Sequence, residues 1–319
     1  MNEETPSSVS SQPTSSEALL EKLVLANLEE RKAQRRSRNI GRGLWLAIAL
    51  VVVWAMFGRG CASKGSALPH TAVVEIKGEI ASGADASAEN IVAALRSAFE
   101  ESSSQAVVML INSPGGSPVQ AGIINDEIKR LKVLHKKPIY AVVEESCASA
   151  AYYIAVASDK IYVDKASIVG SIGVLMDGFG FTGLMDKVGV ERRLMTAGEN
   201  KGFLDPFSPQ TAQHKAYAQA MLNQIHKQFI DVVKQGRGAR LKETPDTFSG
   251  LFWSGQQSVE LGLADELRSL DSVARDVVKA EDIIDYTRHE NVAERLAKRF
   301  GAAVGEGVVK AMRSQAQLK

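Results

Sequence analysis

Residues 106–116 read Ala-Val-Val-Met-Leu-Ile-Asn-Ser-Pro-Gly-Gly, an apolar run that leads directly into a glycine turn. A continuous apolar run of this length is typical of a strand that is buried on both faces, as in a parallel sheet. Residues 119–134, after the turn, have helical periodicity. The stretch therefore predicts a strand, a tight turn and a helix in succession.

The same alternation continues on both sides of this unit. We expect further strands at residues 72–76, 138–143, 160–163, 171–176 and 192–195. We expect further helices at residues 87–101, 152–157, 210–236, 259–261 and 272–280. Strands that alternate with helices indicate a layered α/β domain with a mainly parallel sheet.

The glycine turn has two interpretations. Gly115 and Gly116 can form an ordinary tight connection between strand and helix, because glycine adopts backbone angles that other residues avoid. A loop that opens a helix can also direct backbone N–H groups at an anion. The turn lacks the spacing of phosphate-binding glycine motifs, so nucleotide binding is disfavoured.

Residues 147–153 read Cys-Ala-Ser-Ala-Ala-Tyr-Tyr, where a loop turns into a helix. Ser149 can offer a hydroxyl nucleophile there, and the helix N-terminus would stabilise a nearby negative charge. Serine is also a common helix cap, although Ser146 fits that position better. Cys147 is a rival nucleophile, but no histidine lies in a loop that clearly faces it. A hydroxyl opposite a glycine turn points to acyl transfer.

A serine nucleophile needs a base, and both histidine and lysine serve in known enzymes. Residues 197–207 place Lys201 between glycines and ahead of apolar residues. A desolvated lysine can lose its proton near neutral pH, whereas a lone lysine is more often a solvated surface charge. The residues alone leave both interpretations open.

Residues 40–58 form an apolar stretch of the length that spans a bilayer, with Trp45 and Trp54 suited to its interfaces. A buried core helix is the alternative, and a cleaved signal peptide is disfavoured because the run begins far from Met1. Six basic residues precede the run: Arg31, Lys32, Arg35, Arg36, Arg38 and Arg42. The positive-inside rule then predicts a cytoplasmic N-terminus. The net charge of +1 implies no nucleic-acid partner.

Five motifs, in order, resemble those of the S49 serine peptidases, in the short, single-domain, membrane-anchored form of the signal peptide peptidase A group. They are residues 112–116, 149–155, 157–161, 170–174 and Lys201 ahead of 205–207. The family has Ser-Gly-Gly-Tyr-Tyr where this chain has Ser-Ala-Ala-Tyr-Tyr at 149–153. Alanine keeps the small size and the N–H, so we expect activity to be retained.

The resemblance implies the roles of particular residues. It makes Ser149 the nucleophile, Lys201 the general base, and Ser171 the hydroxyl that orients the lysine amine. The implied oxyanion donors are the backbone N–H groups of Gly115, Gly116 and Ala150. It implies no cofactor and no metal. The implied fold is the α/β Clp protease/crotonase-like spiral of ββα units, with one N-terminal transmembrane helix, assembled into a homo-oligomeric ring.

Composition and hydropathy, together with the extent of the resemblance, predict a division of the chain. We expect a partly disordered cytoplasmic segment at 1–39, a transmembrane helix at 40–58, a linker at 59–70, the S49 peptidase domain at 71–288 and a helical tail at 289–319. Cys61 is expected to be a juxtamembrane thiol without a disulfide to Cys147.

The expected function is a membrane-anchored serine endopeptidase with a Ser–Lys dyad that hydrolyses apolar peptides, such as remnants of signal peptides. We expect it in a bacterial inner membrane, with its catalytic domain on the extracytoplasmic, periplasmic side. One alternative is a catalytically silent, protease-like membrane scaffold, which the joint presence of Ser149, Lys201 and Ser171 disfavours. Another alternative is a crotonase-like protein that binds acyl-CoA. It is disfavoured because CoA is cytoplasmic, whereas the domain is expected outside the cytoplasm.

Overall fold

A computed structural model describes residues 43–48 and 68–288, and the chain separates into two units at residues 1–64 and 65–319. In the first unit, residues 43–48 are helical and exposed. The remainder of the membrane helix expected at 40–58 lies outside the described residues, as do the segments 1–39 and 289–319. No helix within the described ranges is long and apolar enough to cross a bilayer.

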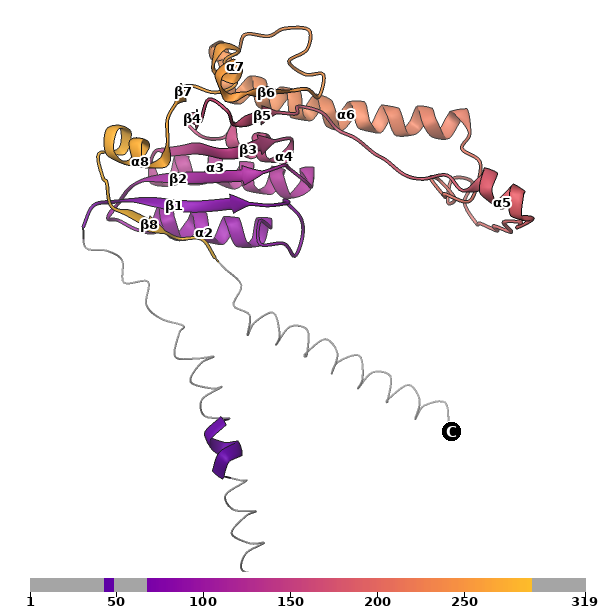
Figure 1. Cartoon of the computed structure of the whole chain (residues 1–319), viewed down its shortest axis with the longest axis horizontal. Coiled ribbons are helices and arrows are strands. Elements are labelled where there is room, and N and C mark those ends of the chain that lie inside the picture. The colour runs from indigo at the N-terminus through magenta and orange to yellow at the C-terminus, as the bar shows by residue number, and fades with distance from the viewer. Residues whose placement is uncertain (1–42, 49–67, 289–319) are drawn as a thin grey trace, which may run out of the picture. The chain divides into compact units, whose positions relative to one another are not determined.

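The second unit is built on one eight-stranded sheet (Figure 1). Its strands are β1 (His70–Lys77), β2 (Ser104–Ser113), β3 (Ile139–Ala148), β4 (Lys160–Val163), β5 (Ile168–Gly170), β6 (Phe252–Ser254), β7 (Glu266–Leu267) and β8 (Ile283–Asp285). The order is β6-β5-β3-β2-β1-β8, with β4 beside β3 and β7 beside β4. All these pairs are parallel except β5 with β6. This mixed sheet confirms the predicted α/β class.

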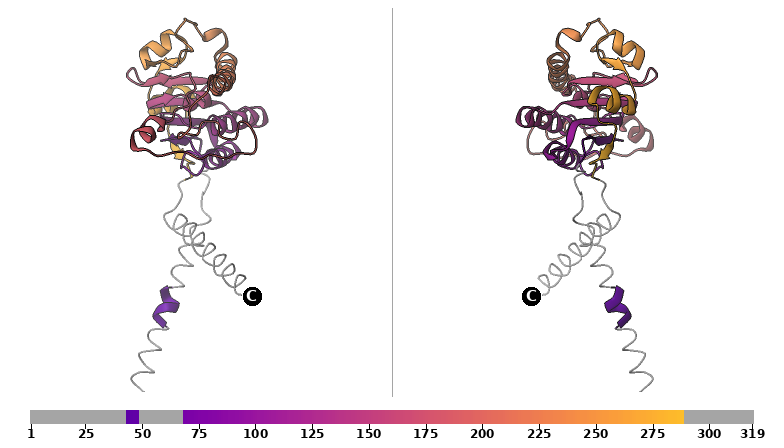
Figure 2. Two further views of the ribbon diagram at one scale, coloured as in Figure 1. Left: turned by 90° about the vertical axis from the view of Figure 1, so that its right-hand side faces the viewer. Right: turned by 90° about the vertical axis from the view of Figure 1, so that its left-hand side faces the viewer.

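Helices cover both faces of the sheet (Figure 2). They are α2 (Ala88–Glu100), α3 (Pro118–His135), α4 (Ala150–Ala155), α5 (Thr182–Val188), α6 (Ala212–Arg237), η1 (Gly238–Arg240), α7 (Gly255–Glu260), α8 (Leu270–Ser272) and η2 (Val273–Val278). The larger core joins α2, α3 and α4 to the sheet, and a smaller one packs Val273 on the opposite face. Val74 belongs to the first core and Val73 to the second, because successive strand residues face opposite sides.

Two predicted strands are wrong. The strand expected at 171–176 lies earlier, because β5 ends at Gly170 and Ser171 has a positive φ of 50° that ends the extended conformation. Residues 192–195 form no strand, since every one of them is exposed and a strand needs a neighbour to satisfy its backbone. Within the loop-to-helix stretch 147–153, Ala148 is the last residue of β3 and α4 begins at Ala150.

Residues 176–211, which we call the arm, leave the sheet after β5, carry α5 and return to α6 (Figure 1). From Gly173 to Gln228 no residue is buried. Of the 26 residues of α6, only Phe229, Val233 and Arg237 are buried, all in its C-terminal part. The arm and the first turns of α6 therefore lack a core of their own.

The C-terminal end of α6 is held by a buried ion pair. The Arg237 side chain is 1% exposed and donates to Asp265 Oδ2 at 2.8 Å and to the Gly262 carbonyl at 2.8 Å. The same carboxylate accepts from the backbone N–H of Ile161 at 2.7 Å and from Arg240 at 3.2 Å. Burial disfavours the ionised form, but these donors outweigh it and hold the pKa of Asp265 below its ordinary value. The network ties α6 to β4.

Asp265→Ala is expected to destabilise the domain by about 3–5 kcal/mol, because it leaves the Arg237 charge buried without its partner. Asp231→Ala is the matched control, since Asp231 pairs with Lys227 on the exposed surface of α6 and should cost less than about 1 kcal/mol. Chemical denaturation at neutral pH measures both. Equal losses in the two variants would contradict the role of the network.

The same comparison has a pH dependence. The ionised Asp265 carboxylate stabilises the folded state, and a lowered pKa means that this contribution disappears only when the group is protonated. The loss of unfolding free energy in Asp265→Ala should therefore have its full size above about pH 4. It should shrink as the pH falls further and the wild-type carboxylate is protonated. A loss that does not change between neutral and acidic pH would contradict the assignment of the ion pair.

Candidate active site

Parallel pairing of β2 and β3 brings the two sequence motifs together. Both strands end at the same edge of the sheet, where Ser113 is the register partner of Cys147. The glycine turn follows β2, and Ser149 follows β3. A further link joins the two strand ends, because Ser146 Oγ donates to Asn112 Oδ1 at 3.2 Å. Ser146 therefore does not cap the following helix.

Ser149 occupies a strained turn between β3 and α4. Its φ of 53° and ψ of −123° lie in a region that residues with a side chain rarely adopt. The residue stands at the N-cap position of α4 but makes no capping bond with its side chain, and its N–H donates to the Gly170 carbonyl at 2.8 Å. The sharp turn leaves the hydroxyl at the pocket described below. Strain of this kind is typical of functional sites.

The glycine turn lies directly against Ser149. A Cβ added to Gly115 would meet the Cβ of Ser149 at 2.7 Å, so only glycine permits this approach. Ile80 fixes the turn from the other side, donating its N–H to the Gly115 carbonyl at 2.9 Å and accepting from Ser117 at 2.7 Å. The glycines are thus required by steric contact on two sides.

The three expected oxyanion donors differ in their surroundings. The Gly115 N–H already donates to Ser113 Oγ at 3.2 Å and the residue is buried. Gly116 lines the pocket, and its N–H has no acceptor within residues 68–288. Ala150, also at the pocket, is the first residue of α4, where backbone N–H groups have no partner inside the helix. The geometry favours Gly116 and Ala150 over Gly115.

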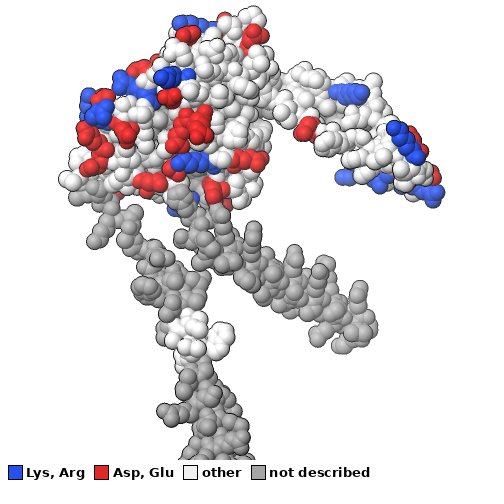
Figure 3. Space-filling view, in the orientation of Figure 1, with Lys and Arg blue, Asp and Glu red and all other residues white. Residues whose placement is uncertain are grey.

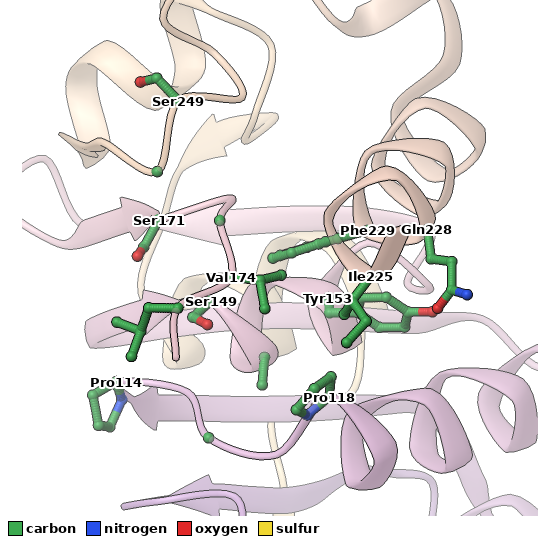
Figure 4. Close-up of a pocket in the computed structure, with 15 residues that line it drawn as sticks. Pro114, Pro118, Ser149, Tyr153, Ser171, Val174, Ile225, Gln228, Phe229 and Ser249 are labelled. Carbon is green, nitrogen blue, oxygen red and sulfur yellow. The ribbon is translucent and has the colours of Figure 1, made fainter. Parts of the chain in front are cut away.

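A pocket of about 560 Å³ opens above Ser149 (Figure 4). Its walls are largely apolar, with Tyr153 from α4, Val174 after β5, and Ile225 and Phe229 from α6. The sequence motifs include Tyr153 and Val174 but did not show that they share a pocket with Ile225 and Phe229, because the residues come from three separate elements that only the fold brings together. An apolar pocket with a few convergent polar groups is the usual form of a binding site.

Ser171 also lines this pocket. Its N–H donates to the Leu251 carbonyl at 2.8 Å, which fixes the residue between β5 and the loop before β6. Among the described residues its hydroxyl has no hydrogen-bond partner. The structure therefore brings Ser149, Ser171, Gly116 and Ala150 to one pocket.

Lys201 lies elsewhere in the same chain. It is exposed, on the arm, and is not among the residues that line the pocket. The neighbouring Phe203 packs on Tyr217 near the start of α6, whereas Phe229, at the pocket, packs on Tyr153. Twelve helical residues separate Tyr217 from Phe229, which amounts to about 18 Å along the axis. One chain alone does not place Lys201 beside Ser149.

Cys147, the alternative nucleophile, has no access to solvent. Cys147 is fully buried in β3, does not line the pocket, and burial raises the pKa of its thiol. A thiol held in this state is a poor nucleophile, because the thiolate is the reactive form. Within the described part of the chain, no three His, Cys, Asp or Glu side chains are grouped to hold a metal ion.

The fold and the site define a Clp protease-like hydrolase scaffold with a serine at the strand-to-helix turn. The model of peptidase family S49 matches residues 132–283, and the Clp protease model matches residues 60–169. A Methanocaldococcus jannaschii protein named as a protease is 32% identical to this chain, over 66% of this chain and 68% of its own length. The chain therefore belongs to the S49 family of serine peptidases.

Two further relatives differ in extent. An Enterococcus faecium protein named as a signal peptide peptidase, SppA, is 28% identical over 62% of this chain and 58% of its own length. A Brucella abortus protein named Na(+)/H(+) antiporter NhaA is 48% identical over 57% of this chain. The match covers only 25% of that protein's length, so its name describes a much longer molecule.

Gly116→Ala is expected to lower peptide turnover by about 10²–10³, the usual effect of losing one oxyanion donor. The added Cβ would meet the Ile80 carbonyl oxygen, and the residue's φ of 145° disfavours a side chain, so the N–H would be displaced. Gly122→Ala is the control, because a Cβ there, on α3, has open space. Turnover of an apolar fluorogenic peptide measures both. An unchanged rate in Gly116→Ala would contradict the assigned donor.

Proposed function

We propose that this chain is a membrane-anchored serine endopeptidase that hydrolyses apolar peptides, including remnants of signal peptides, with Ser149 and Lys201 as its catalytic dyad. The observation that carries the proposal is the strained Ser149 turn, which holds a hydroxyl beside two unpartnered backbone N–H groups in an apolar pocket. This constellation suits nucleophilic attack on a carbonyl and stabilisation of the resulting oxyanion.

The reaction proceeds in two steps. Ser149 Oγ attacks the peptide carbonyl while the neutral amine of Lys201 takes its proton, and the N–H groups of Gly116 and Ala150 hold the oxyanion. The C–N bond then breaks, and Lys201 returns the proton to the leaving amine. In the second step Lys201 takes a proton from water, the hydroxide releases the acyl group, and the proton returns to Ser149 Oγ.

The dyad is formed between two copies of the chain. Lys201 lies too far along the arm to reach its own Ser149, and the arm has no core of its own. It carries several large apolar side chains that are exposed, among them Phe179, Leu184, Val188 and Met195. Exposed apolar surface of this extent is typical of an interface. A homo-oligomeric ring covers it and brings Lys201 to a neighbour's pocket.

In this arrangement Ser171 acts on the neighbour's lysine. Its hydroxyl faces the pocket that holds Ser149 and has no partner elsewhere in the described residues. The incoming amine of Lys201 would donate a hydrogen bond to Ser171 Oγ, which orients the nitrogen lone pair toward Ser149. The unpartnered hydroxyl supports the role that the family resemblance implies.

The substrate class follows from the pocket and from the N-terminal sequence. Tyr153, Val174, Ile225 and Phe229 offer an apolar surface to the side chains of a peptide. The apolar run at 40–58 and the basic residues before it would anchor the chain in a bacterial inner membrane, with the catalytic domain on the extracytoplasmic side. Signal peptides are apolar and remain in that membrane. The name of the Enterococcus relative points to the same class.

Subunit mixing tests the divided dyad. Ser149→Ala and Lys201→Ala are each expected to abolish cleavage of an apolar peptide. Unfolding and refolding them together at equal amounts should restore about a quarter of the wild-type activity, because that share of randomly paired neighbours joins an intact serine to an intact lysine. A dyad formed within one chain would give no recovery at all.

The control for this experiment mixes Ser149→Ala with the double variant Ser149→Ala, Lys201→Ala, which offers no intact serine and should stay inactive. Labelling of the wild type with a fluorophosphonate probe tests the nucleophile itself. Labelling at Ser149 is expected. A wild-type protein that is neither labelled nor active would favour the catalytically silent scaffold.

Membrane anchoring is tested in cells. The full chain should remain in membranes washed with alkaline carbonate, and protease added to spheroplasts should digest residues 68–288. Replacing Leu50 and Val53 by Arg should release the protein, because each charge in the middle of a span costs about 2.5–3.5 kcal/mol. A wild-type chain that the carbonate wash removes would contradict the anchor.

A further inference from the structure

The pocket joins two chain segments that lie on either side of the arm in the sequence. Residues 173–175, where the chain leaves β5, and residues 225–229 of α6, to which it returns, both contribute pocket-lining residues. Figure 4 shows Val174, Ile225 and Phe229 among the side chains that line the pocket together with Ser149. Any change in the distance between these two segments would alter the pocket and the direction of the arm together.

One side chain connects the two segments. His226 of α6 donates its Nε2–H to the backbone carbonyl of Ile172 at 3.0 Å. Ile172 lies between Ser171 and Gly173, both of which line the pocket, and is itself fully buried. Among the described residues, His226 is the donor for this carbonyl. A buried carbonyl that loses its donor is costly, so the bond constrains the backbone strongly.

The backbone at this point needs such a constraint. Ser171 has a φ of 50°, in the left-handed region that favours glycine. Its N–H is fixed to Leu251 at 2.8 Å, and its carbonyl accepts from Gly173 at 2.9 Å. Strained residues keep their conformation only when the surrounding contacts over-determine it. The Leu251 contact fixes the segment from the sheet side, and His226 fixes it from the helix side.

We propose that His226 is a positioning residue. Through the Ile172 carbonyl it sets the place of Ser171 Oγ relative to Ser149, and it sets the direction in which the arm carries Lys201 to a neighbouring copy. This inference rests on the proposed dyad. His226 does not line the pocket and transfers no proton. Its role needs only an Nε2–H donor, which both the cationic ring and the Nε2–H tautomer of the neutral ring provide.

A matched pair of amides separates this role from simple packing. The side-chain amide of Gln reaches about as far as the Nε2 of histidine, whereas the amide of Asn is one bond shorter. His226→Asn is expected to lower kcat about tenfold with KM changed by less than about twofold, since apolar substrate contacts remain in place. His226→Gln should keep kcat within about threefold of wild type.

A second measurement does not depend on activity. In a Ser149→Ala background, hydrogen exchange of a peptide that covers residues 168–176 reports the Ser171 N–H and the Gly173 N–H. Exchange should become faster in His226→Asn by about tenfold and remain near the parent rate in His226→Gln. Thermal unfolding of all the proteins shows that each is folded.

The outcomes are distinguishable. If Asn and Gln variants behave alike in both kcat and exchange, the hydrogen bond does not position the segment and the inference is overturned. If hydrogen exchange is faster in His226→Asn than in His226→Gln but the wild type cleaves no peptide, the proposed function fails. The role of the His226–Ile172 hydrogen bond in fixing the segment is then still supported. If kcat and exchange both separate them, the positioning role is supported.

Discussion

The parallel pairing of β2 with β3 is the constraint on which the rest of this structure depends. It places Ser113 opposite Cys147 at one edge of the sheet, so the chain segments that follow must share the same space. One segment becomes the glycine turn and the other becomes the Ser149 turn. Parallel strands make this edge a natural position for a site, because both carboxyl ends open there.

Close packing at this edge explains the residue types found in it. Gly115 has no room for a side chain because Ser149 lies against it. Gly116 has no room for one because the backbone of Ile80 lies against it. Ser149 itself accepts a backbone conformation that costs energy. The buried core around α4 and the hydrogen bond from the Ser149 N–H to the Gly170 carbonyl hold Ser149 in this conformation. The buried core therefore holds the strained Ser149 turn in place.

The arm, in contrast, is not held by a core. It has no buried residue, and α6 is held in its C-terminal half, by the His226–Ile172 hydrogen bond, the buried Phe229 and Val233, and the Arg237–Asp265 pair. Under the proposed mechanism this division is functional. The body holds the nucleophile and the oxyanion donors, while the arm supplies the base to another copy. Assembly and catalysis then depend on the same surface.

The sequence by itself determined the strands and helices from β1 to β4, the long helix α6, the α/β class and the family, because long apolar runs and the glycine and serine motifs are local signals. It placed one strand wrongly at 171–176, where the positive φ of Ser171 ends β5 at Gly170, and another at 192–195, which is exposed and pairs with no strand among the described residues. Only the tertiary structure decided that Gly116 rather than Gly115 has a free N–H, that α6 forms a pocket wall, and that Lys201 lies away from its own Ser149. The pocket wall and the position of Lys201 depend on contacts between residues tens of positions apart, and a one-dimensional pattern carries no record of which segments meet.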